Sequence, residues 1–511
     1  MKNLFILLTS IASIQLLIAQ DFSGPIAITD ENYDKISSNR SNPTVRGTIH
    51  GASAEELDQL VISYTLVRPS DPFQVKYEAP ILEDGTFTFT LPSNLPYQQI
   101  WFSLKDYAYT CLLANEALQL DFDFSKLKAH PVYLAGDGLT FSGKDGRVNQ
   151  EYNSYTLYHK EKLPNFSRKF QDLDPQAPQY LSKIDSLMSI QRSVDAEFLN
   201  KNRAPATRKI VESQTALEGA TYKIVHASIS GTQISDMHAL ILPVFSITND
   251  SYSYFQVLYQ YTRRMHFKPL ETYKDPVLQF RKIDALYPAP HADLIKLRIN
   301  DPDVQEYAAI LGTLRDHVNQ TWAASYVQQE HQVMQEKAAK IQALLDTEVS
   351  PAEILPFGTP IINTSFQAAL YRSETETAED LLKTIRAALP DKLIVLDLWA
   401  TWCVPCIQNM PHQKRLYEQA KEKQLPIAFV YLCTDRSSSA SKWKNKIAEL
   451  QQPGTHIFVS DQQMDDLFRL VNGSGYPTYI IIKPNGEIDA ETMQTNRQID
   501  IVIFPKNSYD Y

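Results

Sequence analysis

The stretch from Leu393 to Pro411 constrains the fold of this 511-residue chain more than any other. It reads LIVLDLWATWCVPCIQNMP and opens with an apolar run of the kind that forms a strand buried on both faces. Cys403 and Cys406 follow the run directly, at positions that suit the first turn of a helix. Further strands and helices alternate after it, so the pattern predicts an α/β sheet.

The cysteine pair predicts redox chemistry. Unpaired N–H groups and the helix dipole at a first helical turn stabilise a thiolate. One exposed, ionised sulfur can then attack a disulfide, and a second sulfur within reach can resolve the mixed disulfide. Two cysteines could also form half of a zinc site, but zinc takes four ligands and the sequence holds no second pair. Ile407 stands where haem attachment needs histidine, so we expect neither metal nor cofactor.

Composition and charge limit the class of protein. A chain of 511 residues exceeds one hydrophobic core and predicts about three domains. The apolar fraction of 43% and the charged fraction of 21% are those of a globular protein. The formal net charge of −10 argues against a general nucleic-acid binder or a binder of anionic membranes.

Residues 1–20 are predicted to form a secretory signal peptide. Lys2 supplies the positive start, an apolar run follows from Leu4 to Ile18, and Ala19 offers a small residue for cleavage. An uncleaved N-terminal anchor is the alternative, because Leu17 is a poor partner for Ala19 at a cleavage site. We therefore expect a periplasmic or cell-envelope protein. No later stretch of the sequence is long and apolar enough to span a bilayer.

Four cysteines are few for an exported protein of this size. The chain is therefore not a disulfide-stapled scaffold. Cys111 and Cys433 stand alone in apolar, strand-like runs. We expect both to be buried structural thiols rather than reactive ones.

Hydrophobic periodicity divides the rest of the chain. Strict alternation, as in Thr86–Leu91 and Leu118–Phe124, together with turn signals such as Asp84-Gly85, predicts an antiparallel β-sandwich over residues 21–146. From residue 147 to 350 the period becomes helical and predicts an α-helical domain. Prolines near Ser350 mark the start of the α/β domain, residues 351–511.

This last domain resembles the thioredoxin superfamily, and within it the TlpA/ResA-like thiol–disulfide oxidoreductases exported by bacteria. The matching runs are WATWCVPC at Trp399–Cys406 and GYPT at Gly475–Thr478. The resemblance covers roughly residues 351–500 and implies a thioredoxin-like fold. A segment of about 30 residues before the second run, Thr434–Leu467, also fits this branch.

The resemblance implies roles for individual residues. Cys403 and Cys406 form the redox-active disulfide, and a cis Pro477 faces it. The backbone of Tyr476 pairs with the substrate segment, and Trp402 offers a contact surface. Asp397 falls where thioredoxins keep a buried acid, whose raised pKa lets it relay a proton for Cys406. A carboxylate bonded to nearby backbone is the alternative reading of Asp397.

Two features depart from the family pattern. Members of this branch often carry glutamate three residues after the second cysteine, where this chain has Asn409. The resemblance therefore implies no catalytic glutamate in this chain. The C-terminal helix is also missing from the pattern, since Ile499–Phe504 reads IDIVIF and favours a strand.

The resemblance favours a periplasmic disulfide reductase that acts on protein disulfides in envelope redox homeostasis or cytochrome c maturation. Such a reductase needs an electron source, and a membrane thiol donor is the expected partner. A thiol oxidase or isomerase could use the same cysteine pair. A third hypothesis is an envelope binding or scaffold protein whose thioredoxin-like domain senses redox state.

Overall fold

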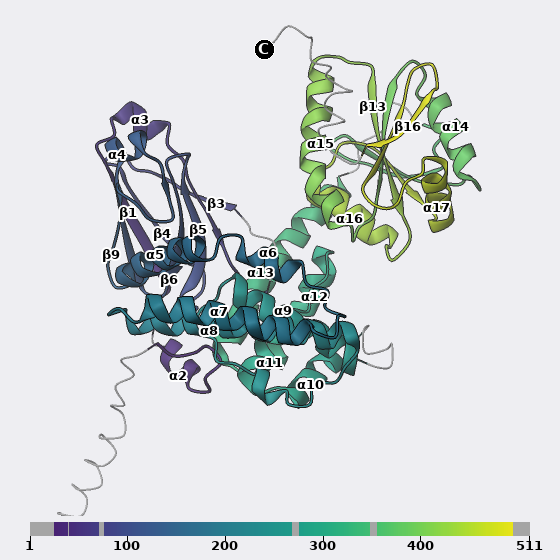
Figure 1. The fold of residues 1–511 in the computed structure, drawn as a ribbon. Helices are drawn as coiled ribbons and strands as arrows, with labels where there is room; N and C mark the ends of the chain where they lie inside the picture. The colour runs from purple at the N-terminus through teal and green to yellow at the C-terminus, as the bar shows by residue number, and fades with distance from the viewer. Residues whose placement is uncertain (1–24, 39, 71–75, 268–274, 348–354, 494–511) are drawn as a thin grey trace, which may run out of the picture. The chain divides into compact units, whose positions relative to one another are not determined.

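The computed structural model of the chain describes residues 25–38, 40–70, 76–267, 275–347 and 355–493 (Figure 1). The predicted signal peptide and the run Ile499–Phe504 lie outside the described residues. The chain divides into two compact units, residues 1–300 with 310–329 and residues 301–309 with 330–511. The domain limits at residues 146 and 350 stay a prediction.

Two mixed sheets form the β region of the first unit. Their strand orders are β4-β1-β7-β9 and β3-β2-β5-β6-β8. The strands are β1 Thr44–His50, β2 Ile62–Leu66, β3 Lys76–Ala79, β4 Thr86–Thr90, β5 Gln98–Leu104, β6 Ala108–Ala114, β7 Ala117–Asp123, β8 Val132–Tyr133 and β9 Leu139–Ser142. The predicted purely antiparallel arrangement is not observed, because β1 pairs parallel with β7 and β6 parallel with β8. Strands of the other sheet lie between β1 and β7 in the sequence. The two strands are therefore not joined by a hairpin, which would make them antiparallel.

The inward faces of these strands follow the alternation in the sequence. Phe87, Phe89 and Leu91 are all buried. One hydrophobic cluster draws residues from both sheets, including Val45 and Leu120 from one sheet and Ile62 and Phe102 from the other. The two sheets therefore share a core.

Helices make up the remainder of the first unit and run into the second. They are α2 Tyr33–Ser37, α3 Ala54–Asp58, α4 Phe124–Ala129, α5 Gly146–Lys162, α6 Phe166–Gln171, α7 Tyr180–Leu199, α8 Pro205–Ser230, η1 His238–Leu240, α9 Asn249–His266, α10 Pro276–Leu286, α11 Ala289–Lys296, α12 Val304–Leu314, η3 Arg315–His317 and α13 Thr321–Asp346. The helical period predicted for this region is illustrated by α7, in which Ile184, Met188 and Phe198 are buried. Within the described ranges, no helix has the length and apolar character needed to cross a bilayer.

The second unit is built on a seven-stranded sheet in the order β10-β11-β14-β13-β12-β15-β16. Its strands are β10 Thr359–Asn363, β11 Ala368–Arg372, β12 Leu393–Trp399, β13 Ile427–Thr434, β14 Gly454–Val459, β15 Thr478–Ile482 and β16 Ile488–Met493. Its own helices are α14 Ala378–Ala388, α15 Val404–Glu422, α16 Ala440–Leu450 and α17 Asp461–Leu470. The four neighbouring strands β11, β14, β13 and β12 run parallel to one another. Strand β15 pairs antiparallel with β12.

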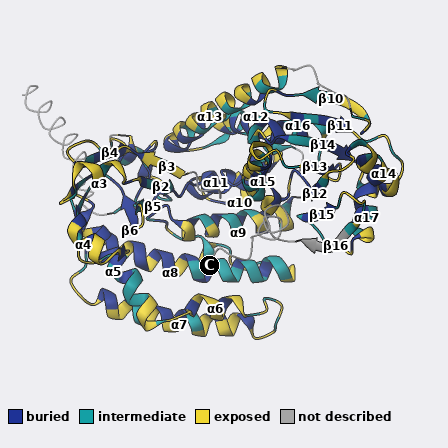
Figure 2. Ribbon diagram, turned by 90° about the horizontal axis from the view of Figure 1, so that it is seen from above, coloured by how far each residue is buried: buried dark blue, intermediate teal, exposed yellow. Residues whose placement is uncertain are grey.

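Helices cover both faces of this sheet. One core cluster joins the even-numbered positions of β12, from Ile394 to Leu398, to α14 and α17. A second cluster joins the odd-numbered positions, such as Val395 and Trp399, to α15 and α16. The helices carry dark-blue and yellow positions along their length, which mark a buried and an exposed face (Figure 2). Asp397 lies on the face of β12 that α15 covers, because it shares the parity of Val395 and Trp399.

Candidate active site

The two cysteines lie at the junction of β12 and α15. Cys403 is the N-cap of α15, and its Sγ accepts a hydrogen bond from the backbone N–H of Cys406 at 3.2 Å. Pro405 occupies the first helical turn, where a missing N–H costs no helical bond. The prediction of a first-turn position holds for Cys406, whereas Cys403 caps that turn. Cys403 and Cys406 form a disulfide with their Cα atoms 5.3 Å apart.

The two sulfurs differ in access. Cys406 is 0% exposed and Cys403 is 4% exposed. We expected a more exposed attacking sulfur, but the neighbours Trp402 and Val404 occupy the solvent positions at 42% and 43% exposure. A groove of about 630 Å³ is lined by Cys403 and not by Cys406. A substrate in this groove meets Cys403 first.

The loop that precedes β15 forms the opposite side of the groove. The Tyr476–Pro477 peptide bond is cis, as the resemblance implied. Thr478 pairs with Leu398 near the end of β12, which places Pro477 at the same end of the sheet as the disulfide. The Tyr476 ring lies edge-on to Trp402, with ring centroids 5.5 Å apart. The structure thus brings Trp402 and Tyr476 together with Cys403 at one groove, and Pro477 follows Tyr476 at the same end of the sheet.

Two residues of the groove were not identified from the sequence. The Phe468 ring of α17 lies edge-on to Tyr476, with centroids 5.0 Å apart. Arg436 follows β13, and its backbone oxygen accepts a hydrogen bond from the Trp402 indole at 2.8 Å. The Arg436 guanidinium pairs with Asp461 at 2.6 Å and Asp465 at 3.0 Å. Helical spacing makes Phe468 look like a core residue, and an isolated arginine carries no motif.

Asp397 is 1% exposed, on the face of β12 that α15 covers. Its Oδ2 accepts a hydrogen bond from Nε2 of Gln413 at 2.9 Å, and its Oδ1 has no partner among the described residues. Burial raises the pKa of the Asp397 carboxyl group to about 7, and the Gln413 bond opposes the rise. The hydrogen-bond donor to Asp397 is thus a side chain of α15, whereas the alternative interpretation expected a bond to nearby backbone. Gln413 was missed, although its position seven residues after Cys406 places it on the same helix face.

The remaining cysteines are free thiols, and both are buried. Burial raises the pKa of the Cys111 thiol to about 12 and that of the Cys433 thiol well above its usual value. The prediction of inert structural thiols agrees with this placement, because a protonated, covered thiol is a poor nucleophile.

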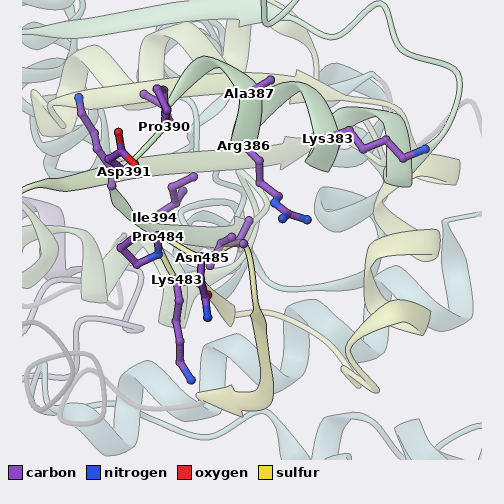
Figure 3. Close-up of a pocket in the computed structure, with 13 residues that line it drawn as sticks. Lys383, Arg386, Ala387, Pro390, Asp391, Ile394, Lys483, Pro484 and Asn485 are labelled. Carbon is purple, nitrogen blue, oxygen red and sulfur yellow. The ribbon is translucent and has the colours of Figure 1, made fainter.

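A second cavity, of about 490 Å³, lies at the other end of β12. Ile394 and Ile482, which pair across β12 and β15, are among its lining residues. Figure 3 shows the basic side chains of Lys383, Arg386 and Lys483 around it. Its lining contains no cysteine or methionine. Across the described part of the chain, no three His, Cys, Asp or Glu side chains are arranged to hold a metal ion.

Comparison with known proteins identifies the domain that carries this site. A family model described as Thioredoxin-like matches residues 391–488. The thiol-disulfide oxidoreductase ResA of Oceanobacillus iheyensis is 35% identical over 101 residues, which cover 20% of this chain and 49% of that protein. ResA of Bacillus thuringiensis is 29% identical over 111 residues, covering 21% of this chain and 60% of that protein. The chain thus spans about half the length of the first relative.

Solved structures give further matches of low overall similarity. The thioredoxin domain of a thiol-disulfide oxidoreductase from Bacteroides vulgatus is 23% identical, with a TM-score of 0.18, covering 20% of this chain and 69% of that one. A thiol:disulfide interchange protein from Bacteroides sp. is 17% identical, with a TM-score of 0.21, and the match covers 30% of this chain and 91% of that one. On the family model and the ResA relatives, the C-terminal region contains a thioredoxin-like domain within a multidomain chain.

Proposed function

We propose that this protein is a thiol–disulfide oxidoreductase that reduces protein disulfides through Cys403 and Cys406. The observation that carries the proposal is the position of Cys403, at the N-cap of α15 and at the wall of a groove, bonded to a fully buried Cys406. The ResA relatives support the same chemistry. The roles of Trp402, Tyr476 and Pro477 in holding substrate belong to this proposal.

The reaction begins with the reduced pair. The Cys403 thiolate attacks one sulfur of a substrate disulfide, so that a Cys403–substrate bond forms and the substrate S–S bond breaks. The released substrate thiolate takes up a proton. Cys406 then loses its proton and attacks Cys403, which forms the Cys403–Cys406 disulfide and releases the second substrate thiolate. A dithiol donor must return two electrons and two protons to the pair before the next turnover.

Asp397 supplies the base for the second step in this proposal. A carboxylate accepts the proton of the Cys406 thiol best when its pKa lies near the working pH. The pKa of Asp397, raised to about 7 by burial, meets that condition. The proton later passes to the departing substrate thiolate or to solvent.

The compartment and partners are also part of the proposal. The signal-peptide pattern at residues 1–20 supports export to the periplasm or cell envelope. That compartment is kept oxidising, so a reductase in it depends on electrons delivered from elsewhere, and a membrane thiol carrier fits this need. Substrate cysteines in cytochrome c maturation or in general envelope redox homeostasis have the required chemistry.

Direction of electron flow separates a reductase from an oxidase or isomerase. We expect a reduction potential near or below that of the glutathione couple, about −230 mV. A potential near −120 mV, as in a strong oxidant, would instead assign the oxidase function.

Turnover tests whether the protein is an enzyme or a redox-sensing scaffold. The full chain, supplied with a dithiol, is expected to accelerate the reduction of insulin disulfides. Cys403→Ser should bring the rate to the uncatalysed background, because a serine hydroxyl does not ionise near neutral pH. Cys111→Ser is the matched control and should keep the parent rate. Full activity in Cys403→Ser would refute the mechanism, and no activity in the parent would favour the scaffold hypothesis.

A further inference from the structure

We infer that Gln413 is a positioning residue, whose side-chain amide turns to hold the Asp397 carboxyl group in both of its protonation states. The inference rests on the proposed function, because it concerns the group that handles the Cys406 proton. It adds a residue that neither the sequence motif nor the family resemblance singles out.

Gln413 lies between Asp397 and Tyr479 on the buried face of α15. Its side chain is 1% exposed, and Cys406 and Met410 share the same buried face. Its Nε2 donates to Asp397 Oδ2 at 2.9 Å and to the Tyr479 hydroxyl at 3.0 Å. Asp397 and Tyr479 are directly paired across β12 and β15, so both side chains point to the same face of the sheet. The amide therefore bridges two neighbouring polar groups in an apolar core.

Two acceptor atoms at this bridge have no partner among the described residues. They are Oε1 of Gln413 and Oδ1 of Asp397, and both are buried. An unpartnered buried acceptor is costly, and here two of them lie on residues that are hydrogen-bonded to each other. They are accounted for if the network serves more than one hydrogen-bonding arrangement.

A glutamine amide has one donor end and one acceptor end. The donor end suits an ionised Asp397, which only accepts hydrogen bonds. Once Asp397 takes up a proton, a half-turn of the amide lets Oε1 accept from the Asp397 hydroxyl. Oε1 can also accept from the Tyr479 hydroxyl, which is able to donate as well as accept. The network reverses by rotation of the amide and two hydroxyl groups, with the backbone in place.

The groups that face Asp397 from the packed elements do not compete with it for the proton. Tyr431 and Cys433 face it from β13 and Tyr479 from β15, and α15 contributes Gln413, which is buried on that helix as Cys406 is. Burial holds the pKa values of Tyr431, Cys433 and Tyr479 above their usual values, so these groups stay neutral near pH 7. Gln413 is the one hydrogen-bond donor among the causes that set the Asp397 pKa.

The test compares two buried glutamines. Gln413→Met keeps the length of the side chain and removes both amide atoms. Gln452→Met is the matched control, since Gln452 is 0% exposed, donates to the Tyr431 hydroxyl at 2.7 Å and has an unpartnered Oε1, but no carboxylate partner. The titration of Asp397 is followed in the oxidised full chain by ¹³C NMR of labelled aspartate carboxyl groups, assigned with Asp397→Asn.

Gln413→Met should move the Asp397 titration midpoint upward by about one pH unit, because the carboxylate loses its donor. The pH profile of insulin reduction should move with it, while Gln452→Met should change neither. Gln413→Leu also lacks both amide atoms and should move the midpoint in the same direction, so it provides the test if Gln413→Met does not fold. An unchanged midpoint in the folded variants would overturn the inference. If the parent chain reduces no disulfide, the proposed function fails while the NMR midpoint still tests Gln413.

Discussion

At the residue scale, Asp397 couples the redox site to the stability of the domain. Its pKa is raised from 3.8 to about 7 by burial, so the folded chain holds this proton more tightly than the unfolded chain. The contribution to stability is fully present below about pH 4 and is lost as the pH rises through 7. Above that pH the folded domain must carry a buried carboxylate whose negative charge is stabilised only by the Gln413 hydrogen bond among the causes that set its pKa.

Asp397→Asn removes this pH dependence. The free energy of unfolding of the variant, relative to the parent, should increase between pH 4 and pH 8 by on the order of a few kcal/mol. Urea unfolding of the oxidised proteins at the two pH values measures the difference. A variant whose relative stability is the same at both pH values would show that Asp397 titrates normally in the folded chain.

The sequence motif located the central residues of the site but not those that support them. Cys403, Cys406 and Pro477 lie in the two short runs that carry the family resemblance. Gln413 and Phe468 reach the site from α15 and α17 through the packing of the sheet, and no local pattern records that packing. A polar residue seven positions after Cys406, on an otherwise apolar helix face, was the one signal available for Gln413.

At the element scale, α15 makes its two cysteines chemically different. Cys403 precedes the first turn and accepts the Cys406 N–H, whereas the side chain of Cys406 is enclosed by the core. A helix N-terminus stabilises negative charge on a sulfur placed as Cys403 is. Access and charge therefore both favour Cys403 as the attacking group.

Alkylation of the reduced chain tests this difference. Iodoacetamide at pH 7 should label Cys403 at least about tenfold faster than Cys406, since reaction needs an accessible thiolate. Mass spectrometry of the digested protein gives the two rates. Cys111 and Cys433 serve as internal controls and should stay unlabelled until the chain is denatured. Equal labelling of Cys403 and Cys406 would contradict the assignment of roles.

The elements predicted best are those with long apolar or periodic runs. Strand β12 and the start of helix α15 appear where the Leu393–Pro411 run predicted them. The shorter strands β10, β11 and β14 and the helix α17 were missed, because short mixed runs carry weak periodicity.

In the first unit, side chains complete strand pairing in a way that no pattern reveals. The Asn149 amide bonds to both backbone groups of Leu113, and the Asn153 amide bonds to both backbone groups of Cys111. These two asparagines of α5 thereby satisfy backbone groups of β6. Sequence alternation predicts a strand such as β6, but it does not reveal that side chains of a helix bond to the backbone of that strand.

At the scale of the whole molecule, the thioredoxin-like domain extends into the helical region. Segments 301–309 and 330–346 belong to the same compact unit as the redox site. Val304 and Ile341 pack with Ala448 of α16, and Lys337 pairs with Glu449. This compact unit therefore includes part of α13, while the predicted domain limit at residue 350 stays a prediction.

A fragment comparison tests this extension. A chain beginning at Glu330 should be more stable than one beginning at Leu355 by about 1–3 kcal/mol, because it keeps the apolar contact of Ile341 with α16. Urea unfolding followed by tryptophan fluorescence gives both midpoints. Identical midpoints would show that the helical segment adds nothing to the stability of the domain.

All the residues of the proposed site lie between Asp397 and Pro477, and its chemistry rests on Cys403 as the sulfur that bonds to substrate. The most direct measurement uses Cys406→Ser, which lacks the resolving thiol and should accumulate the mixed disulfide. Reduced Cys406→Ser mixed with oxidised insulin should yield a covalent adduct, and mass spectrometry should place it on the peptide that contains Cys403. The same adduct in Cys403→Ser/Cys406→Ser, or an adduct on Cys111 or Cys433, would contradict the account.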